Sequence, residues 1–423
     1  MKRLLIITYY WPPNGGAGVQ RWLKFAKYLP EHGWQPVIYT PSNPEVILPD
    51  AALELEVPKE AELVKRPITE PYGFYKQLTG RGKDEKVHTA FLSEEKRQGW
   101  REDAALWVRS NLFIPDARVW WVKPSIRNLK AYLKDHPVDA VVTTGPPHSL
   151  HLIGRALKRD LGLRWIADWR DPWTNIDFYQ QLKLTGWADR KHKRLERAVL
   201  KEADHTIAVG WTMAAELEAL GAKHVDVITN GYDPADVPSP HATVDETYSL
   251  VHVGSLSATR NAPELWKALA QLCRQDPTFA AKLKLRFVGA VDHTALASIA
   301  AAGLADKVER IGPVSHAEAM RHMQQARVLL LLLNDTANAK GILTSKLFEY
   351  LSVGRPLLSI GPKDGDVARV LGSERIVERG SEERSLASIR ALFDQSAQAT
   401  GETYVAYSRP ALTGQLVRML ERK

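Results

Sequence analysis

Short apolar runs alternate with segments of helical period along almost the whole chain, and this alternation limits the possible fold more than any other feature. Each run is only a few residues long and ends in Gly, Pro, Asp or Asn, as buried strands do. Strands that are apolar throughout and separated by helices are typical of parallel sheets covered on both faces. The sequence therefore predicts an α/β fold of doubly wound, Rossmann-like parallel sheets.

The alternation restarts after the turn-rich segment NGYDPADVPSP, which has the composition of a linker. A chain of 423 residues is long enough for two domains of roughly 200 residues each. We predict a first domain over 1–237, a second over 238–403, and a terminal helix, 404–423, that packs back on the first. The candidate strands are LLIITYY, QPVIYTP, AELVKRP, VDAVVTTG, LRWIADW, HTIAVG and VDVITNG before the linker, and YSLVHVGSL, LKLRFVGA, KVERIGPV, RVLLLLLN, RPLLSIG and RIVERG after it.

The amino-acid composition excludes some classes of protein and indicates the cellular compartment. The lone cysteine, Cys273, excludes a disulfide framework and a cysteine-based zinc site, and it fits a reducing cytosol. The basic, apolar start is shorter than a signal peptide and is closed by Pro12 and Pro13, and no later apolar run approaches the length of a membrane span. We therefore predict a cytoplasmic protein. The formal charge of +8 favours an acidic partner such as nucleic acid, a lipid surface or a phosphorylated small molecule.

The loop after the first strand, WPPNGGAGVQRW, leads directly into a helix. Gly15 and Gly16 lie at this strand-to-helix turn, where backbone N–H groups and the helix dipole favour a phosphate. The loop lacks the third glycine of G-x-G-x-x-G, and no acidic residue ends the second strand, so a nicotinamide dinucleotide is disfavoured. An anion site and a tight turn without ligand both remain open.

Two further loops of the first half carry polar side chains. In TTGPPHSLH, His148 can hydrogen-bond a sugar hydroxyl, or it can merely cap the following helix with Ser149. In ADWRDPW, Asp168 can act as a base or hydroxyl ligand on the acceptor side, or it can pair with an arginine as a structural clamp. The two carboxylates of this loop, Asp168 and Asp171, have no histidine close by, so we expect no metal there.

In the second half, HVGSLSATRN leaves a strand through Gly254 and reaches Arg260, which can neutralise a diphosphate leaving group or remain a solvated charge.

The segment TSKLFEYLSVGRPLL begins a helix capped by Thr344 or Ser345. Lys346 in the first turn opposes the helix dipole, which is easier to explain if an anion binds there. Glu349 lies one turn further on, where its carboxylate can accept ribose hydroxyls while the amides near Thr344 and Ser345 hold phosphates. This pattern predicts a seat for a nucleotide diphosphate.

Taken together and in this order, the motifs resemble those of the retaining GT-B glycosyltransferases of family 4 over nearly the whole chain. WPPNGGAGVQRWLKFAKYL is similar to the family's glycine loop near the donor phosphates, ITNGYD to its strand before the interdomain linker, and TSKLFEYLSVGRPLL to its nucleotide-binding helix. SKLFEY resembles the variant of subgroups that build bacterial surface polysaccharides. The resemblance says nothing of the sugar.

The resemblance implies two facing Rossmann-like domains, the first on the acceptor side and the second binding a nucleotide sugar, with no metal or other cofactor. It places His148 near a catalytic-pocket histidine. With the local chemistry it gives four candidate catalytic residues, His148, Arg260, Lys346 and Asp168, and six donor-binding residues, Gly15, Gly16, Gly254, Thr344, Ser345 and Glu349. Gly341 stands where the family has its first Glu, and Ser255 where it has a basic residue.

The stretch 98–134 is rich in tryptophan and basic residues. Such a mixture suits a helix lying on a membrane surface, which would fit a lipid-linked acceptor and peripheral association with the inner face of the cell membrane. Alternatively, the tryptophans pack inward. Both interpretations stay open.

Two rival functions share parts of this pattern. A nucleotide-sugar 2-epimerase has the same fold and nucleotide seat, and a basic nucleic-acid-binding protein has the same charge. The basic residues are not gathered on one helix, so we expect no nucleic-acid partner. The donor base and sugar, the acceptor, the linkage and the oligomeric state are not specified by the sequence.

Overall fold

The computed structural model describes residues 1–46, 49–70, 100–238, 243–394 and 404–422, which form two compact units. Unit 1 comprises Met1–Ile228 and Thr413–Lys423, and unit 2 comprises Thr229–Leu412. The division thus lies after Ile228 instead of after residue 237. The reason is local, because Tyr232 of the predicted linker pairs with the end of unit 2: its N–H donates to the Tyr407 carbonyl (3.2 Å) and its carbonyl accepts from the Arg409 N–H (2.8 Å).

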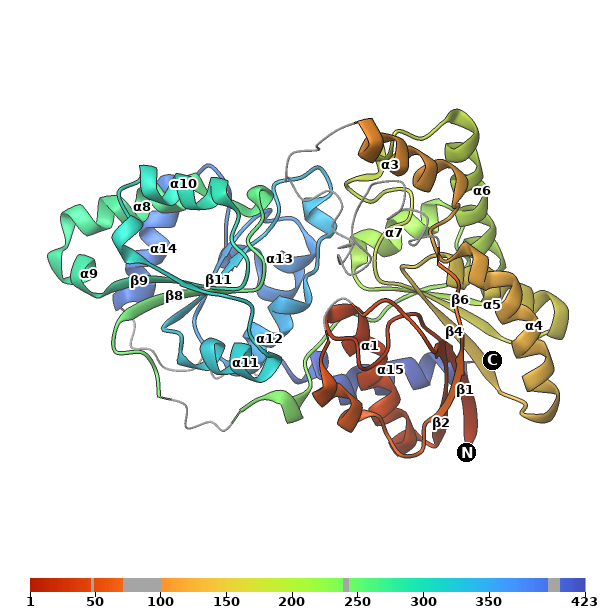
Figure 1. The fold of residues 1–423 in the computed structure, drawn as a ribbon. Helices are drawn as coiled ribbons and strands as arrows, with labels where there is room; N and C mark the ends of the chain where they lie inside the picture. Colours follow the sequence, from red (N-terminus) through yellow and green to blue (C-terminus); the bar gives the residue numbers. More distant parts are fainter. Residues whose placement is uncertain (47–48, 71–99, 239–242, 395–403, 423) are drawn as a thin grey trace. The chain divides into compact units, whose positions relative to one another are not determined.

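Unit 1 is built on a seven-stranded parallel sheet in the order β3-β2-β1-β4-β5-β6-β7 (Figure 1). The central strands are buried on both faces, and Leu5 of β1 lies between Val37 and Val141 of its two neighbours. The edge strand β3 is largely exposed and polar, which disfavours pairing of its free side with a strand of another molecule. The strands are β1 (Lys2–Ile7), β2 (Trp34–Pro41), β3 (Glu62–Arg66), β4 (Ala140–Gly145), β5 (Trp165–Trp169), β6 (His205–Ala208) and β7 (Val225–Val227).

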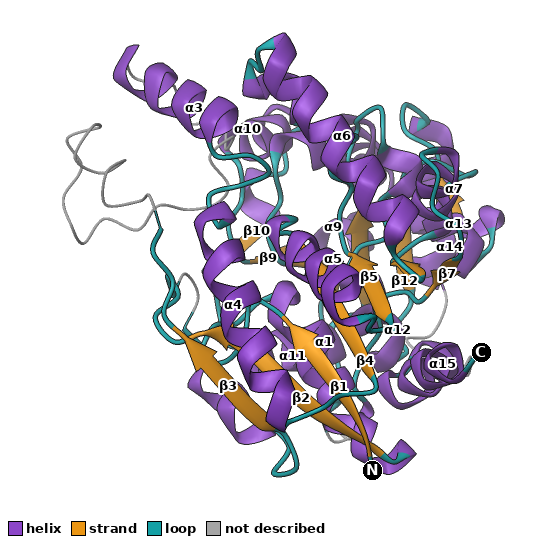
Figure 2. Ribbon diagram, turned by 90° about the vertical axis from the view of Figure 1, so that its right-hand side faces the viewer, coloured by secondary structure: helices purple, strands orange, loops and turns teal. Residues whose placement is uncertain are grey.

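Helices cover both faces of this sheet. Helices α4 and α5 pack beside each other on one face and α1 lies on the other (Figures 1 and 2). The last helix, α15 (Arg409–Glu421), ends in unit 1, where Arg164 donates to the carbonyls of Met419 (3.0 Å) and Leu420 (2.7 Å). The other helices are α1 (Ala17–Tyr28), α3 (Trp100–Leu112), α4 (Val119–Asp135), α5 (Ser149–Leu161), α6 (Gly186–Glu202) and α7 (Trp211–Ala219).

Unit 2 repeats the architecture with a six-stranded parallel sheet in the order β10-β9-β8-β11-β12-β13. Its central strands β8 and β11 are buried along their whole length. The strands are β8 (Tyr248–Val253), β9 (Leu283–Val288), β10 (Val308–Ile311), β11 (Val328–Leu332), β12 (Leu357–Ile360) and β13 (Ile376–Val377). The helices are α8 (Pro263–Gln275), α9 (Pro277–Lys282), α10 (His293–Ala301), α11 (His316–Gln325), α12 (Ser345–Val353), α13 (Asp366–Leu371) and α14 (Glu382–Asp394).

The predicted α/β class with doubly wound parallel sheets is confirmed in both units. In each sheet the strand order reverses once, between β1 and β4 in unit 1 and between β8 and β11 in unit 2. Ligands of open parallel sheets bind outside the carboxyl ends of the strands at this reversal. The predicted loops at Gly15 and His148 follow β1 and β4, and those at Gly254 and Lys346 follow β8 and β11.

None of the helices in the described ranges is at once long and apolar enough to cross a membrane.

Candidate functional site

The glycine loop of unit 1 is tied to the loop after β5 by Arg170. Gly16 adopts φ +89° directly before α1, and its carbonyl accepts the first helical hydrogen bond, from Val19 (3.0 Å). A Cβ on Gly18 would lie 2.8 Å from the Arg170 guanidinium, which donates to the Gly18 carbonyl (2.9 Å). Arg170 also donates to the Pro146 carbonyl. The loops after β1 and β4 are therefore held together, and the first amides of α1, which have no acceptor within the helix, face this edge.

His148 is the N-cap residue of α5, but its side chain makes no capping hydrogen bond. Asp116 takes that role, since its carboxylate accepts from the Ser149 N–H (2.8 Å) and hydroxyl (2.9 Å). The His148 ring stacks on Trp173 with centroids 4.9 Å apart, and its Nδ1 has no hydrogen-bond partner among the described residues. Burial, followed by His151 and Arg170, holds the pKa of His148 well below its usual value. This Nδ1 is itself buried beside Gly145, so a sugar hydroxyl could meet the neutral imidazole only at Nε2.

Behind it, His151 is fully buried and stacks on Trp169, with ring centroids 5.2 Å apart. The Thr143 hydroxyl accepts from the Trp165 indole (2.9 Å) and shares a second hydrogen bond with His151 Nδ1, 2.8 Å away. Burial lowers the pKa of His151 to about 3. His151 therefore serves packing.

Asp168 is the centre of a buried clamp. The Arg21 guanidinium donates to both of its oxygens (2.8 to 3.2 Å), and the Trp22 indole (2.7 Å) and the Thr144 hydroxyl (2.8 Å) donate to one of them. Burial raises the pKa of this carboxyl, but the Arg21 charge and these hydrogen bonds outweigh burial and lower it. A fully buried carboxylate whose two oxygens both accept hydrogen bonds supports the structural-clamp alternative over a base for an acceptor hydroxyl.

In unit 2, the loop after β8 meets the start of α12 at Gly254 and Lys346. Gly254 has φ +95°, a backbone conformation that favours glycine, and a Cβ there would lie 3.0 Å from Lys346 Nζ, so a larger residue would crowd the ammonium. Lys346 Nζ also lies 3.1 Å from Nε2 of His252 on β8. Burial, followed by repulsion from Arg260, lowers the pKa of Lys346 to about 7.

Arg260 is anchored at the same edge of the sheet. Its Nε donates to Asn334 (2.8 Å), which follows β11, and its Nη1 donates to the Ser255 carbonyl (2.9 Å). The side chain is thus fixed close enough to Lys346 for the two positive charges to repel. Two neighbouring cations at the carboxyl ends of β8 and β11 form a site that an anion would stabilise.

Helix α12 is capped by Thr344, whose hydroxyl accepts from the Lys346 N–H (3.3 Å), and Ser345 is the first helical residue. This decides between the two predicted caps. Glu349 lies further along α12, with its Oε1 3.4 Å from Nε2 of His316 at the start of α11. Its negative charge partly offsets the repulsion at Lys346, so Glu349 belongs to the same neighbourhood.

Within each unit, the structure brings the predicted residues to the edge of the sheet where the strand order reverses. The structure also adds residues that the sequence did not single out: Arg21 in the Asp168 clamp, and His252, Asn334 and His316 around Lys346, Arg260 and Glu349. Of these residues, only His252 could have been noticed in the sequence, because it is a polar residue in the apolar end of a strand, two residues before Gly254.

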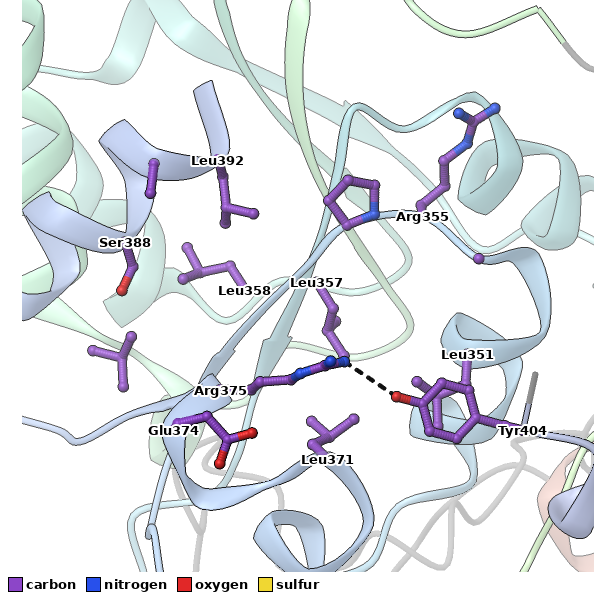
Figure 3. A pocket seen from close by; sticks show the side chains of 14 residues that line it. Leu351, Arg355, Leu357, Leu358, Leu371, Glu374, Arg375, Ser388, Leu392 and Tyr404 are labelled. Atoms are coloured by element: carbon purple, nitrogen blue, oxygen red, sulfur yellow. Dashed lines mark hydrogen bonds between the residues drawn. The ribbon is translucent and has the colours of Figure 1, made fainter. Parts of the chain in front are cut away.

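A pocket of about 390 Å³ lies elsewhere in unit 2 (Figure 3). Five of its 14 lining residues are leucines, and Arg375 donates across it to the Tyr404 hydroxyl (3.3 Å). The lining residues include Arg355 and Pro356, just before β12, and Glu374 and Arg375, just before β13. The pocket is therefore at the amino ends of these strands and contains none of the predicted site residues.

Comparisons with known proteins agree with this architecture. The family described as glycosyl transferase 4-like domain matches residues 15–232. A search of curated proteins found no significant match. Among solved structures, similar folds include a sucrose-phosphate synthase from Thermosynechococcus elongatus (14% identity, TM-score 0.61, 99% of both chains covered). Another is a trehalose-6-phosphate protein from E. coli bound with UDP-2-fluoro glucose (10%, 0.61, 100% of this chain and 99% of that one).

A third is WaaG, a glycosyltransferase involved in lipopolysaccharide biosynthesis (15% identity, TM-score 0.53, 99% of this chain and 95% of that one). At these identities the structural likeness speaks for the fold, while the family match covers more than half of the chain. The chain belongs to the glycosyl transferase 4-like family and is a glycosyltransferase with the GT-B fold.

Proposed function

We propose that the enzyme moves a sugar from a nucleotide-diphosphate donor to a glycan or lipid-linked acceptor, with retention of configuration. The observation that carries the proposal is the pair of cations in unit 2. Lys346 and Arg260 lie close enough to repel each other at the start of α12, and the pKa of Lys346 falls to about 7 through burial and this repulsion. The negative charge of a diphosphate would compensate both the burial of the Lys346 ammonium and its repulsion by Arg260.

In the proposed reaction, the bond between the sugar carbon and the donor phosphate oxygen breaks, and the acceptor oxygen attacks on the same face. The acceptor proton passes to the departing phosphate oxygen. Arg260, Lys346 and the amides of Thr344 and Ser345 stabilise the negative charge that develops on the phosphates, as oxyanion-stabilising groups do. We also propose that Gly15 and Gly16 contribute amides to the donor phosphates. The mechanism as proposed needs no metal and no covalent nucleophile.

Two further residues have proposed roles toward the substrates. Glu349 accepts hydroxyls of the donor ribose, for which its position one turn into α12, beside Lys346, is suitable. His148 hydrogen-bonds a sugar hydroxyl through the neutral imidazole that its burial maintains. Asp168 acts indirectly, by holding α1 against β4 and β5 through Arg21, Trp22 and Thr144.

Replacing Glu349 with alanine is expected to abolish the rise in melting temperature that a nucleotide diphosphate produces. Bound nucleotide stabilises the fold by mass action, and the substitution removes the ribose contact. The measurement is a thermal-shift screen with UDP, GDP, ADP, TDP and CMP, followed by the variant with whichever nucleotide stabilises the wild type. Glu383→Ala, on the exposed surface of α14, is the matched control and should keep the full shift. Full retention of the shift by Glu349→Ala would place the ribose elsewhere.

We further propose that unit 1 associates peripherally with a membrane through α3, the start of α4 and the start of α6. Trp107, Trp120 and Trp187 are 43%, 51% and 56% exposed. Helices α3 and α6 are joined where Asn111 accepts from the Thr185 N–H (2.7 Å). Lys191 lies over the Trp187 ring, and α6 carries further basic residues. Exposed tryptophan beside basic side chains suits the headgroup layer.

Changing Trp107 and Trp120 to alanine is expected to reduce binding to anionic phospholipid vesicles by about tenfold or more, because each indole adds apolar area to the lipid contact. Vesicle flotation measures this. Leu161→Ala, which removes a similarly exposed apolar side chain from α5, is the control. Unchanged flotation of the double variant, or no flotation of the wild type, contradicts the membrane proposal.

A further inference from the structure

A buried histidine stands directly behind Lys346. His252 is fully buried on β8, with its Nδ1 3.0 Å from the carbonyl oxygen of Leu330 on the neighbouring strand β11. A carbonyl oxygen can only accept, so Nδ1 carries the proton of this hydrogen bond. The sheet itself therefore determines which ring nitrogen of His252 is protonated.

The other nitrogen is left as an acceptor. Burial, followed by the charge of Lys346, holds the pKa of His252 well below its usual value, so the ring is neutral and carries one proton. Nε2 then offers a lone pair to Lys346 Nζ, 3.1 Å away. The Ser255 carbonyl lies 3.5 Å from the same nitrogen, at the limit of hydrogen-bond length, so Leu330 has the stronger claim on the proton.

Lys346 has few alternative partners to hold it in place. Among the described groups whose charge acts on it, Arg260 repels it and Glu349 attracts it from further along the same helix. The Tyr350 hydroxyl, also on α12, already accepts from the Val253 N–H (2.8 Å). A lysine side chain is long and loses rotamer freedom when it is fixed, so a direct acceptor is needed to define the position of its ammonium.

We propose that His252 is a positioning residue for the transfer reaction, holding the Lys346 ammonium over Gly254 so that its remaining N–H groups point to the diphosphate of the donor. This inference rests on the proposed function. His252 does not touch the donor. It acts through Lys346, and an acceptor lone pair at Nε2 also favours the charged form of the amine, which the diphosphate requires.

Two substitutions of His252 test its contact with Lys346 separately from its contact with Leu330. In His252→Gln, the terminal amide stands near the place of Nε2 and can accept from Lys346, but the bond to Leu330 is lost. In His252→Asn, the amide stands near the place of Nδ1 and can keep the bond to Leu330, but Lys346 loses its acceptor. We expect the glutamine variant to bind nucleotide diphosphate within about threefold of the wild type and the asparagine variant to bind about tenfold or more weakly, as for loss of a charged hydrogen bond.

The pH dependence gives a readout that a purely structural role would not change. Binding requires the protonated amine, so affinity falls as the pH rises through the pKa of Lys346. Without the acceptor at Nε2 that pKa is lower still, and the fall in affinity for His252→Asn should begin at a lower pH than for the wild type and for His252→Gln. Calorimetric titration of the nucleotide diphosphate between pH 6 and 9 measures both quantities.

A double-mutant cycle tests whether the effect passes through Lys346. In a Lys346→Met background, His252→Asn should cause no further loss of nucleotide affinity. Equal affinities and pH profiles for the glutamine and asparagine variants, or an equal loss in the Lys346→Met background, overturn the proposal. If the wild type binds no nucleotide diphosphate, the proposed function fails instead, so the two failures are distinguishable.

A measurement on the wild-type protein covers the case in which a variant does not fold. Nitrogen NMR of the labelled histidines should show His252 protonated at Nδ1 and unprotonated at Nε2 between pH 6 and 8. A proton on Nε2 would mean that His252 cannot accept from Lys346, and the proposal would be wrong.

Discussion

Replacing Lys346 with methionine is expected to weaken binding of the donor nucleotide diphosphate by about 10-fold to 100-fold, the loss that removal of a charged hydrogen bond produces. The same change is expected to raise the melting temperature of the free enzyme near neutral pH. Methionine fills similar space on α12, but it leaves no positive charge beside Arg260 and none to desolvate at Gly254. Nucleotide titration and thermal unfolding measure the two effects.

The gain in stability has a defined dependence on pH. Lys346 has a pKa of about 7 in the folded protein, against about 10.4 in an unfolded chain. Between these values the unfolded chain binds more protons than the folded one, so the lysine destabilises the fold increasingly as the pH falls. The destabilisation is complete below about 7 and absent above about 10.4. The advantage of Lys346→Met should therefore disappear at high pH.

Lys340→Met is the matched control, because Lys340 is 61% exposed and pairs only with the exposed Asp364 among the contacts described for its side chain. It should change neither nucleotide affinity nor melting temperature appreciably. Unchanged nucleotide affinity in Lys346→Met would remove Lys346 from the donor site.

Replacing Asp168 with alanine is expected to lower the free energy of unfolding by about 3 to 5 kcal/mol, because Arg21 would be left as an uncompensated buried charge. The Arg21 charge and the hydrogen bonds to Asp168 hold its pKa below the usual value despite burial. The stabilisation it contributes is therefore complete above about pH 4, the unfolded value, and is lost as the pH falls through the lower folded pKa.

Chemical denaturation followed by tryptophan fluorescence measures this loss, with Asp160→Ala as the control. Asp160 pairs with Lys130, and both side chains are about 40% exposed, so its removal should cost less than about 1 kcal/mol. A stable Asp168→Ala variant that has lost transfer activity would instead support a base at this position and contradict the clamp.

The fold could be predicted from the sequence because its signal is local and repeated. Most candidate strands are short apolar runs, and parallel strands buried on both faces leave little choice of architecture. The position of Lys346 was informative for a similar reason. A cation in the first turn of a helix is locally unfavourable, and the structure places a second cation, Arg260, beside it.

The partners of these residues could not be predicted, because they come from distant parts of the chain. The place of Asp168 at a strand end left both an acceptor-side base and a structural clamp open, and its partner Arg21 lies on α1, 147 residues away. His252 and Lys346 are separated by 94 residues. Neither pairing leaves a pattern in a single sequence, since only the strand order brings the segments together.

Composition alone could not decide which tryptophans of residues 98–134 are buried and which are exposed. Trp121 is buried and stacks on Tyr39 with ring centroids 5.0 Å apart, as the inward-packing alternative requires. Its neighbour Trp120 is 51% exposed, as the membrane alternative requires. Adjacent residues of a helix point in different directions. The position of each tryptophan around the helix therefore decides whether it is buried or exposed, and composition does not contain this information.

In the proposed donor site, Lys346 and Arg260 of unit 2 recognise the terminal phosphate of the donor nucleotide. The most direct measurement compares the affinities of the wild type and of Lys346→Met for the diphosphate and the monophosphate of the same nucleoside. We predict that the wild type binds the diphosphate more tightly by about tenfold or more and that Lys346→Met loses most of this preference. Equal preference in the two proteins would contradict the claim.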